Sequence, residues 1–410
     1  MKIGRKSLVL IVIGLAILLR GYFNSTAHVS IPTPLSKAFY LSKAQRHFKK
    51  IQLFSGGGFQ SAVFLGYSDG LRKRGWLPDL VIGTCGGAFA ALLTSSLPNP
   101  EDRIAFLRSP EFYEELRRVV INKSKTNSST LLSEVTHLEI QAVSETPFLP
   151  LPNVFRKEDV ALWLPLRFNF SLAALSFSAS GVRSIIVASH FLFGPGEEGT
   201  SSGDASRKWY REAYFTDAQT ARLLENRVST MAALYPQSAI DSNTEVHTDW
   251  TLGDAARASM ADIRYIQPVQ KGDQYYGGGF LDLFPVELAL ELGQEVVAVR
   301  PTSFSHIENV VMRTSFGVDG NERFRYLRER LEIDPEVSKR VHWLDTSDLN
   351  SIYSRCGMNP HLVIGIRSRM DDRIPGNYAE YLRRVDCLYN YGLEKAQTVD
   401  LGKSVIPIEN

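Results

Sequence analysis

Short apolar runs that end in glycine-rich turns open the globular part of the chain. Ile51–Phe54 stops at Gly56–Gly58, and Leu80–Ile82 runs into Gly83–Gly87. Each run has the length of a buried strand and is followed by a helical pattern, such as the apolar spacing over residues 60–74. Strand, turn and helix twice in succession predict a βαβ unit, and therefore a parallel sheet covered by helices.

The pattern continues more weakly along the rest of the chain. We predict a strand at 184–188, a helix at 251–261, a third glycine turn at 277–279, a helix at 286–292 and a strand at 295–299. The remainder of 99–237 is expected to form helices and loops that elaborate the sheet. After residue 301 the pattern is rich in Arg and Glu and predicts helices.

The amino-terminal segment has the features of an export or anchoring signal. Lys2, Arg5 and Lys6 precede an apolar run over Leu8–Leu19, and Ser25–Ala27 offers a cleavage site of small residues. The run is shorter than the roughly 20 residues of a spanning helix, so a cleaved signal peptide and an uncleaved anchor both remain open. An apolar helix packed on the domain is the third alternative. We expect a protein that is membrane-associated or exported.

Charge and cysteine content exclude several classes of function. Lys and Arg number 46 against 44 Asp and Glu among 410 residues, so a net charge of +2 gives no reason to expect a nucleic-acid partner. The cysteines, Cys85, Cys356 and Cys387, are odd in number and widely spaced, which argues against a disulfide framework and against structural zinc. At least one thiol is expected to remain unbridged.

The turn Gly83-x-Cys85-x-Gly87 has the form of a nucleophile elbow, with cysteine where serine is usual. The central residue of an elbow has a strained backbone, and glycines two positions away remove Cβ atoms that would collide. The N–H groups of the turn Gly56–Gly58 are predicted to line the same crevice as an oxyanion hole. A buried cysteine in a tight turn and a nucleotide-binding loop at Gly56–Gly58 are the alternatives; the second lacks a third glycine, because Ser61 occupies that position.

Four blocks of the sequence resemble, in order, those of the patatin-like phospholipase family, and the resemblance covers about Lys49 to Arg300. The blocks are SGGGF at Ser55–Phe59, LVIGTCGGA at Leu80–Ala88, ARASMA at Ala256–Ala261 and YGGGFLDLFPV at Tyr276–Val286. The resemblance implies a three-layer α/β fold with a central, mostly parallel sheet. It divides the chain into a signal or anchor at 1–27, a linker at 28–48, a patatin-like domain at 49–300 and a helical extension at 301–410 that packs on the same domain.

The resemblance also implies a serine/aspartate dyad that cleaves acyl esters of membrane lipids without a metal or cofactor. By position, the nucleophile falls on Cys85, the oxyanion donors on Gly57 and Gly58, and the dyad aspartate on Gly277. Both catalytic side chains are therefore substituted. The basic residue and glycine that follow the family's triple glycine fall on Gln60 and Ser61, which are two further departures.

Two carboxylates and one histidine are candidates to replace the missing catalytic base. Asp282 and Asp273 lie within a few residues of Gly277, and His306 follows the end of a predicted strand. Each also has an ordinary structural reading, because nearness in sequence does not establish hydrogen-bond reach. Asp282 is retained as a possible substitute base.

Two hypotheses follow for the activity. In the first, the domain is an impaired or inactive pseudoenzyme that keeps an apolar crevice and acts by binding lipid or a partner. In the second, Cys85 forms an acyl-thioester and the protein is an active thiol acyl hydrolase or acyltransferase, because on the order of 3 % of an ordinary thiol is thiolate at pH 7. The sequence gives no indication of a protein partner.

Overall fold

The computed structural model describes residues 46–57, 60–118, 120–121, 162–163, 167–197, 207–262, 266–299, 304, 309, 312, 316–332, 334–359 and 374–401. The expected signal or anchor at 1–27, the oxyanion candidate Gly58 and the histidine His306 lie outside these ranges. Within them, no helix combines the length and the apolar character needed to cross a membrane.

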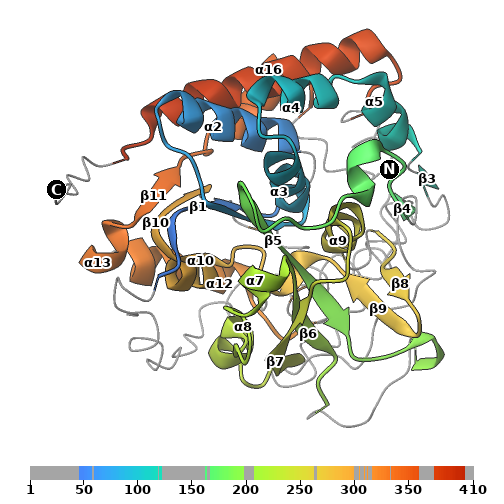
Figure 1. Ribbon diagram of the computed structural model, residues 1–410, viewed down its shortest axis with the longest axis vertical. Coiled ribbons are helices and arrows are strands. Elements are labelled where there is room, and N and C mark those ends of the chain that lie inside the picture. The colour runs from blue at the N-terminus through green and yellow to red at the C-terminus, as the bar shows by residue number, and fades with distance from the viewer. Residues whose placement is uncertain are drawn as a thin grey trace, which may run out of the picture.

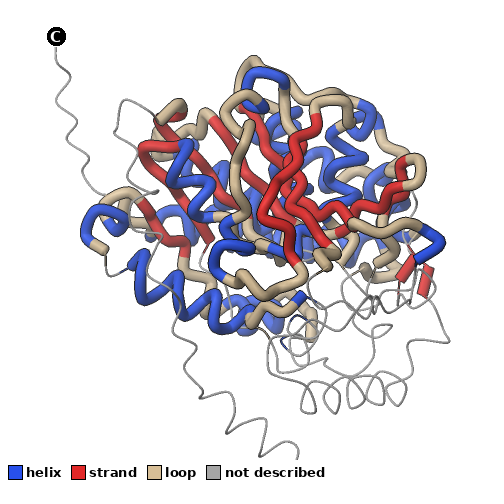
Figure 2. The backbone as a smooth tube through the Cα atoms, turned by 90° about the horizontal axis from the view of Figure 1, so that it is seen from below, coloured by secondary structure: helices blue, strands red, loops and turns tan. Residues whose placement is uncertain are grey.

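A mostly parallel sheet forms the centre of the molecule (Figures 1 and 2). Its strand order is β11-β10-β1-β2-β5-β6-β7, and the hairpin of β8 and β9 attaches to β5. The bounds are β1 Phe48–Phe54, β2 Leu80–Thr84, β5 Arg183–Phe191, β6 Tyr210–Phe215, β7 Ile240–His247, β8 Val269–Lys271, β9 Gln274–Gly277, β10 Gly293–Val299 and β11 Val341–Leu344. All neighbours from β11 to β5 are parallel, whereas β5 pairs antiparallel with β6 and with β9.

Helices cover both faces of this sheet, which gives three layers (Figure 1). One face packs on α2 Ser61–Lys73, α3 Gly86–Ser96, α9 Leu252–Ser259 and α16 Tyr378–Thr398, and the other on α10 Val286–Leu292. Successive residues of a strand point to opposite faces: Val81 joins the first core, whereas Leu80 and Ile82 join the second. Burial on both faces explains why the central strands are continuous apolar runs. The predicted α/β fold is confirmed.

Strands β6 and β7, which continue the sheet past β5, were not predicted from the sequence. Residues 99–237 were expected to hold mainly helices and loops apart from one strand, but they contain all of β6 as well as β5. The adjacent edge strand β7, with sequence IDSNTEVH, is mostly half-buried or exposed. Because an edge strand needs no continuous apolar run, hydrophobic patterning gave no signal for it.

The part of the chain after residue 301 contributes to the same body. Besides helices it supplies β11, which pairs with β10 at one edge of the sheet, so the extension is not purely helical. The long helix α16 lies along α2 (Figure 1). Glycines allow this approach: a Cβ on Gly66 would lie 2.1 Å from the Tyr389 carbonyl oxygen, and one on Gly392 2.3 Å from that of Val63.

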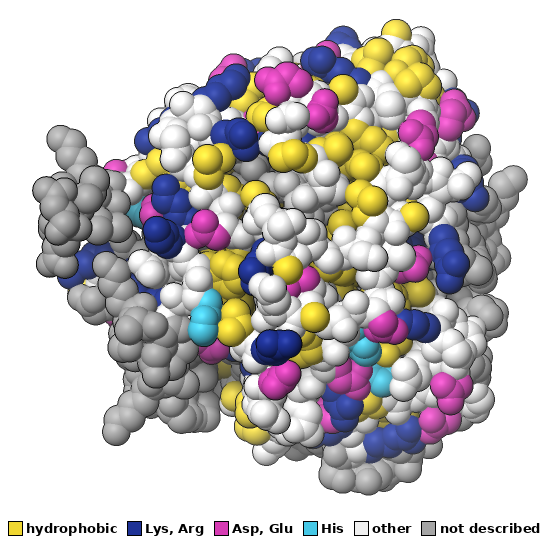
Figure 3. All heavy atoms as spheres, viewed as in Figure 1, with side chains coloured by type: hydrophobic (Ala, Val, Ile, Leu, Met, Phe, Trp, Pro, Cys, Tyr) yellow, Lys and Arg dark blue, Asp and Glu magenta, His cyan; other side chains and the backbone are white. Residues whose placement is uncertain are grey.

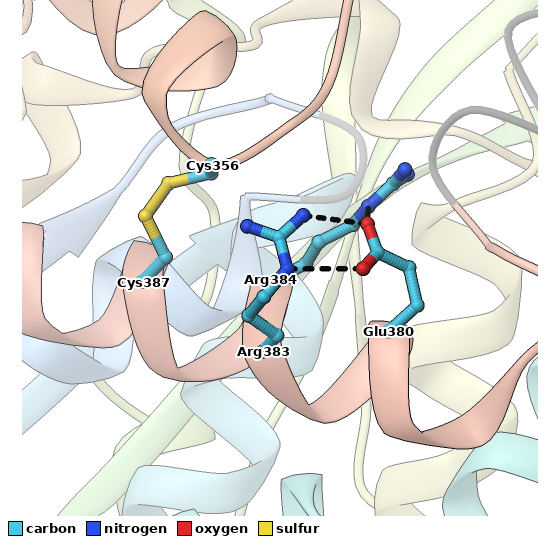
Figure 4. The surroundings of a disulfide bond; sticks show 5 residues. All are labelled: Cys356, Glu380, Arg383, Arg384 and Cys387. Atoms are coloured by element: carbon cyan, nitrogen blue, oxygen red, sulfur yellow. Dashed lines mark hydrogen bonds and ion pairs between the residues drawn. A yellow bond between two sulfur atoms is a disulfide. The ribbon is translucent and has the colours of Figure 1, made fainter.

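A disulfide between Cys356 and Cys387 joins the end of α14 (Leu349–Arg355) to α16 (Figure 4). The spacing of the cysteines, which argued against a disulfide framework, did not predict this single bridge. Their Cα atoms lie 5.7 Å apart although the residues are separated by 31 positions, a proximity that only the folded path of the chain creates. Cys85 stays outside the disulfide, as expected for at least one thiol.

Removing this disulfide should lower stability. For the double variant Cys356→Ala/Cys387→Ala we expect the free energy of unfolding to fall by about 2–4 kcal/mol, because the unfolded chain loses a cross-link. Urea denaturation followed by circular dichroism measures the change. Reducing agent should destabilise the wild type and the Cys85→Ala control but leave the double variant unaffected. Equal denaturation midpoints for the oxidised wild type and the double variant would contradict a stabilising bond.

Candidate active site

Cys85 has the backbone of a nucleophile elbow. It stands between β2 and α3 with φ of 50° and ψ of −123°, a conformation that few residues other than glycine adopt. The flanking glycines are required, as predicted: a Cβ on Gly83 would lie 2.5 Å from the Gly87 carbonyl oxygen. One on Gly87 would lie 2.3 Å from the carbonyl oxygen of Phe54. The Cys85 side chain sits at the amino end of α3, where helix N–H groups stabilise a developing negative charge.

The glycine turn after β1 lies at the same edge of the sheet as the elbow. β1 and β2 are parallel neighbours, and the Leu283 carbonyl oxygen joins their ends. It accepts hydrogen bonds from the Gly56 N–H at 3.1 Å and from the Thr84 hydroxyl at 2.9 Å. Gly57 comes directly after Gly56. The predicted oxyanion donor therefore lies at the same edge of the sheet as Cys85.

The two departures after the triple glycine occupy the start of α2. A Cβ on Gly57 would lie 2.8 Å from Oε1 of Gln60, so the Gln60 side chain is adjacent to the glycine turn. Ser61 is the first residue of α2, and it lines a small apolar pocket with side chains of α16 such as Leu388. Neither position carries a charge beside the glycine turn.

A carboxylate that sequence reasoning missed contacts the nucleophile position. The Cys85 thiol donates a hydrogen bond to Oδ2 of Asp262, with 3.4 Å between sulfur and oxygen. The Cys85 N–H donates to Oγ of Ser259 at 2.8 Å, and the Ser259 hydroxyl donates to the Val187 carbonyl oxygen at 2.5 Å. Ser259 lies inside the block ARASMA and Asp262 directly follows it, so an acidic residue at the end of that block was the available signal.

The backbone around Gly278 leaves room for this carboxylate. The Gly278 N–H donates to the Ala261 carbonyl oxygen at 2.7 Å, which ties the end of β9 to the segment that carries Asp262. A Cβ on Gly278 would lie 2.6 Å from Oδ1 of Asp262. Only glycine at 278 is therefore compatible with the observed position of the carboxylate.

Gly277, to which the resemblance assigns the dyad aspartate, is closely packed. It is the last residue of β9 and pairs with Ser189 of β5. A Cβ at 277 would lie 2.5 Å from Cζ of Phe191, whose buried ring stacks on Phe193 and meets Phe280. An aspartate at this position would require the Phe191 ring to move.

Asp282 and Asp273 lie in other surroundings. Asp282 is buried, accepts a hydrogen bond from the Phe284 N–H at 3.1 Å, and pairs with Arg323 at 3.4 Å. Arg323 in turn donates to both carboxylate oxygens of Glu287. Burial raises the pKa of Asp282 to about 7, because the attraction of Arg323 offsets desolvation only in part and Glu287 adds repulsion. Asp273 is exposed in the turn between β8 and β9.

These features define an α/β protein with a nucleophile elbow beside a glycine-rich turn. The profile of the patatin-like phospholipase family matches residues 53–290, so the chain belongs to this family. No curated protein matches the chain in sequence. The crystal structure of VipD from Legionella pneumophila is similar at 12% identity and a TM-score of 0.31, covering 87% of this chain and 69% of that one.

The packing at Gly277 predicts coupled stability changes. Gly277→Ala should cost about 1–3 kcal/mol, because the added methyl overlaps the buried Phe191 ring. Phe191→Leu should reduce that cost, so the double variant is less destabilised than the sum of the single variants. Denaturant unfolding of the four proteins measures this coupling. Additive losses would show that Phe191 does not limit the side chain at 277.

The raised pKa of Asp282 predicts a pH-dependent stability. An ordinary Asp titrates near pH 4 in an unfolded chain, so between about pH 4 and about pH 7 the folded state keeps a proton that the unfolded state has lost. The contribution of Asp282 to the free energy of unfolding should therefore fall as the pH rises from about 4 to about 7. Asp282→Asn should remove this component, which thermal unfolding of both proteins from pH 4 to pH 8 measures. Parallel pH profiles would refute the assignment.

Proposed function

We propose that the protein is a cysteine-dependent acyl-transfer enzyme of lipid esters, with Cys85 as nucleophile. The observation that carries this proposal is the strained backbone of Cys85 at the amino end of α3, beside the glycine turn of β1. Membership of the patatin-like phospholipase family supports a lipid ester as substrate. Water as acceptor makes the protein a hydrolase, and an alcohol makes it an acyltransferase.

A thiol suits the elbow without the aspartate that the family keeps at position 277. The thiolate is the nucleophilic form, and proximity to a helix amino terminus favours it over the neutral thiol. The glycine turn that includes Gly57 would donate N–H groups to the oxyanion of the tetrahedral intermediate. A serine hydroxyl in the same position would depend more strongly on a base, because it is a weak nucleophile until deprotonated.

Lipid binding without turnover is the second candidate. The observation that favours it is the packing of Phe191 against Gly277, which leaves no room for a base at the position the resemblance assigns. Such a pseudoenzyme would hold a lipid at the elbow and release no fatty acid. Both candidates share the lipid ligand and differ in the fate of the acyl group.

A location at a membrane or beyond it is part of the same proposal. The apolar segment near the amino terminus supports it, and so does the Cys356–Cys387 disulfide, since disulfides persist mainly in oxidising compartments. Figure 3 shows charges of both signs dispersed over one face, with hydrophobic side chains exposed between them. A lipid surface is the partner we propose.

Acyl transfer to Cys85 can be tested directly. Purified protein incubated with a p-nitrophenyl acyl ester should gain the mass of one acyl group, mapped by peptide mass spectrometry to Cys85. Cys85→Ala should gain none, and the Cys356→Ala/Cys387→Ala variant should still be acylated. Steady release of fatty acid from phospholipid vesicles separates an enzyme from a lipid-binding pseudoenzyme. Absence of an adduct at Cys85 would overturn the proposed chemistry.

A further inference from the structure

We propose that Asp262 is the general base of this site and replaces the carboxylate that position 277 lacks. The inference rests on the proposed function, because a base is needed only if Cys85 carries an acyl group. It adds a catalytic residue from a different segment of the chain, the loop that follows α9.

The first support is the contact with the nucleophile. The Asp262 carboxylate accepts the hydrogen bond of the Cys85 thiol at 3.4 Å, so an acceptor for the proton lies within direct reach of the nucleophile. No intervening group is required for the transfer. Asp282, the base considered from the sequence, instead pairs with Arg323 at 3.4 Å.

The second support is that one segment positions both partners. Ser259 holds the strained backbone of Cys85 through the 2.8 Å hydrogen bond, and Asp262 reaches the thiol three residues further on. The Gly278 N–H anchors the same segment by its 2.7 Å bond to the Ala261 carbonyl oxygen. Nucleophile and base are therefore fixed relative to each other by hydrogen bonds of the Cys85 and Gly278 N–H groups to one segment.

The third support is the complementary arrangement of the glycines. Phe191 blocks a side chain at 277, whereas the missing Cβ of Gly278 makes room for the Asp262 carboxylate, which would otherwise lie 2.6 Å away. The site thus excludes a carboxylate from one segment and admits one from its neighbour.

The reaction has two balanced stages. Asp262 takes the thiol proton while sulfur attacks the ester carbonyl carbon; the intermediate then collapses, the C–O bond breaks, and the leaving alcohol receives that proton. Water next attacks the thioester carbon and gives a proton to Asp262. The C–S bond breaks, the sulfur regains the proton, and a carboxylic acid leaves. Ester and water become alcohol and acid, with no change in oxidation state.

The second stage should depend most strongly on Asp262. A thiol is partly ionised near neutral pH and can attack an ester without help, but water is a weak nucleophile that requires deprotonation. General-base assistance contributes about 10²- to 10⁴-fold. Removing the base should therefore leave an acyl-enzyme that forms and persists.

The experiment compares the full-length protein with Asp262→Asn and with Asp273→Asn, an exposed carboxylate in the β8–β9 turn that serves as matched control. With p-nitrophenyl butyrate, Asp262→Asn should retain a stoichiometric burst of p-nitrophenol and slow its steady turnover about 10²- to 10⁴-fold. The acyl group should remain on Cys85 by intact mass. The control should turn over like the wild type.

Two rescue measurements distinguish a base from a structural side chain. Hydroxylamine attacks thioesters without a protein base, so it should discharge acylated Asp262→Asn as fast as acylated wild type. Formate should restore turnover to Asp262→Ala, because it supplies a carboxylate to the space that the side chain vacates. Asp262→Ala also serves as the test variant if Asp262→Asn does not fold. Wild-type turnover by Asp262→Asn, or loss of activity that neither reagent restores, overturns the role of Asp262. Failure of the wild type to acylate Cys85 overturns the proposed function instead.

Discussion

The site depends on a carbonyl oxygen that joins two strand ends. Leu283 accepts hydrogen bonds from the Gly56 N–H after β1 and from the Thr84 hydroxyl at the end of β2. A single acceptor thus holds the glycine turn and the elbow at a fixed separation. The close approach of Gly87 to the Phe54 carbonyl oxygen tightens the same junction and excludes every side chain at 87. Oxyanion stabilisation needs such fixed geometry, because donors that must reorganise stabilise the transition state less.

The C-terminal helix α16 supports the same junction. α2 begins directly after the glycine turn, and α16 packs against it through Gly66 and Gly392 at backbone contact distance. The buried Asp69 of α2 also accepts a hydrogen bond from Tyr389 of α16 at 2.6 Å. The disulfide then ties α16 to α14. Helix α2 cannot shift without disturbing these contacts, so the C-terminal helix helps to fix the helix that follows the glycine turn.

The sequence was sufficient to predict the elements that depend on local interactions. β1, α2, β2 and α3 were predicted because their apolar runs and glycine turns lie in one continuous stretch, and the steric demand at Gly83 and Gly87 follows from the spacing alone. Asp262 escaped prediction because 177 positions separate it from Cys85 and only the approach of α9 to the elbow brings them together. The disulfide escaped for the same reason, because its cysteines lie 31 positions apart. Strand β7 escaped because a half-exposed edge strand carries no continuous apolar run.

A base is required at a point in space and not at a position in the chain. The end of β9 and the segment after α9 meet through the Gly278 N–H and the Ala261 carbonyl oxygen, and Asp262 of the second segment contacts the Cys85 thiol. As the proposed base, Asp262 would approach the nucleophile from the segment after α9 and not from β9. A thiolate attacks without further loss of a proton, whereas a serine hydroxyl must lose its proton as it attacks. The proposed base at 262 is therefore consistent with a cysteine at 85 and with a glycine at 277, where the Phe191 ring occupies the space of a side chain.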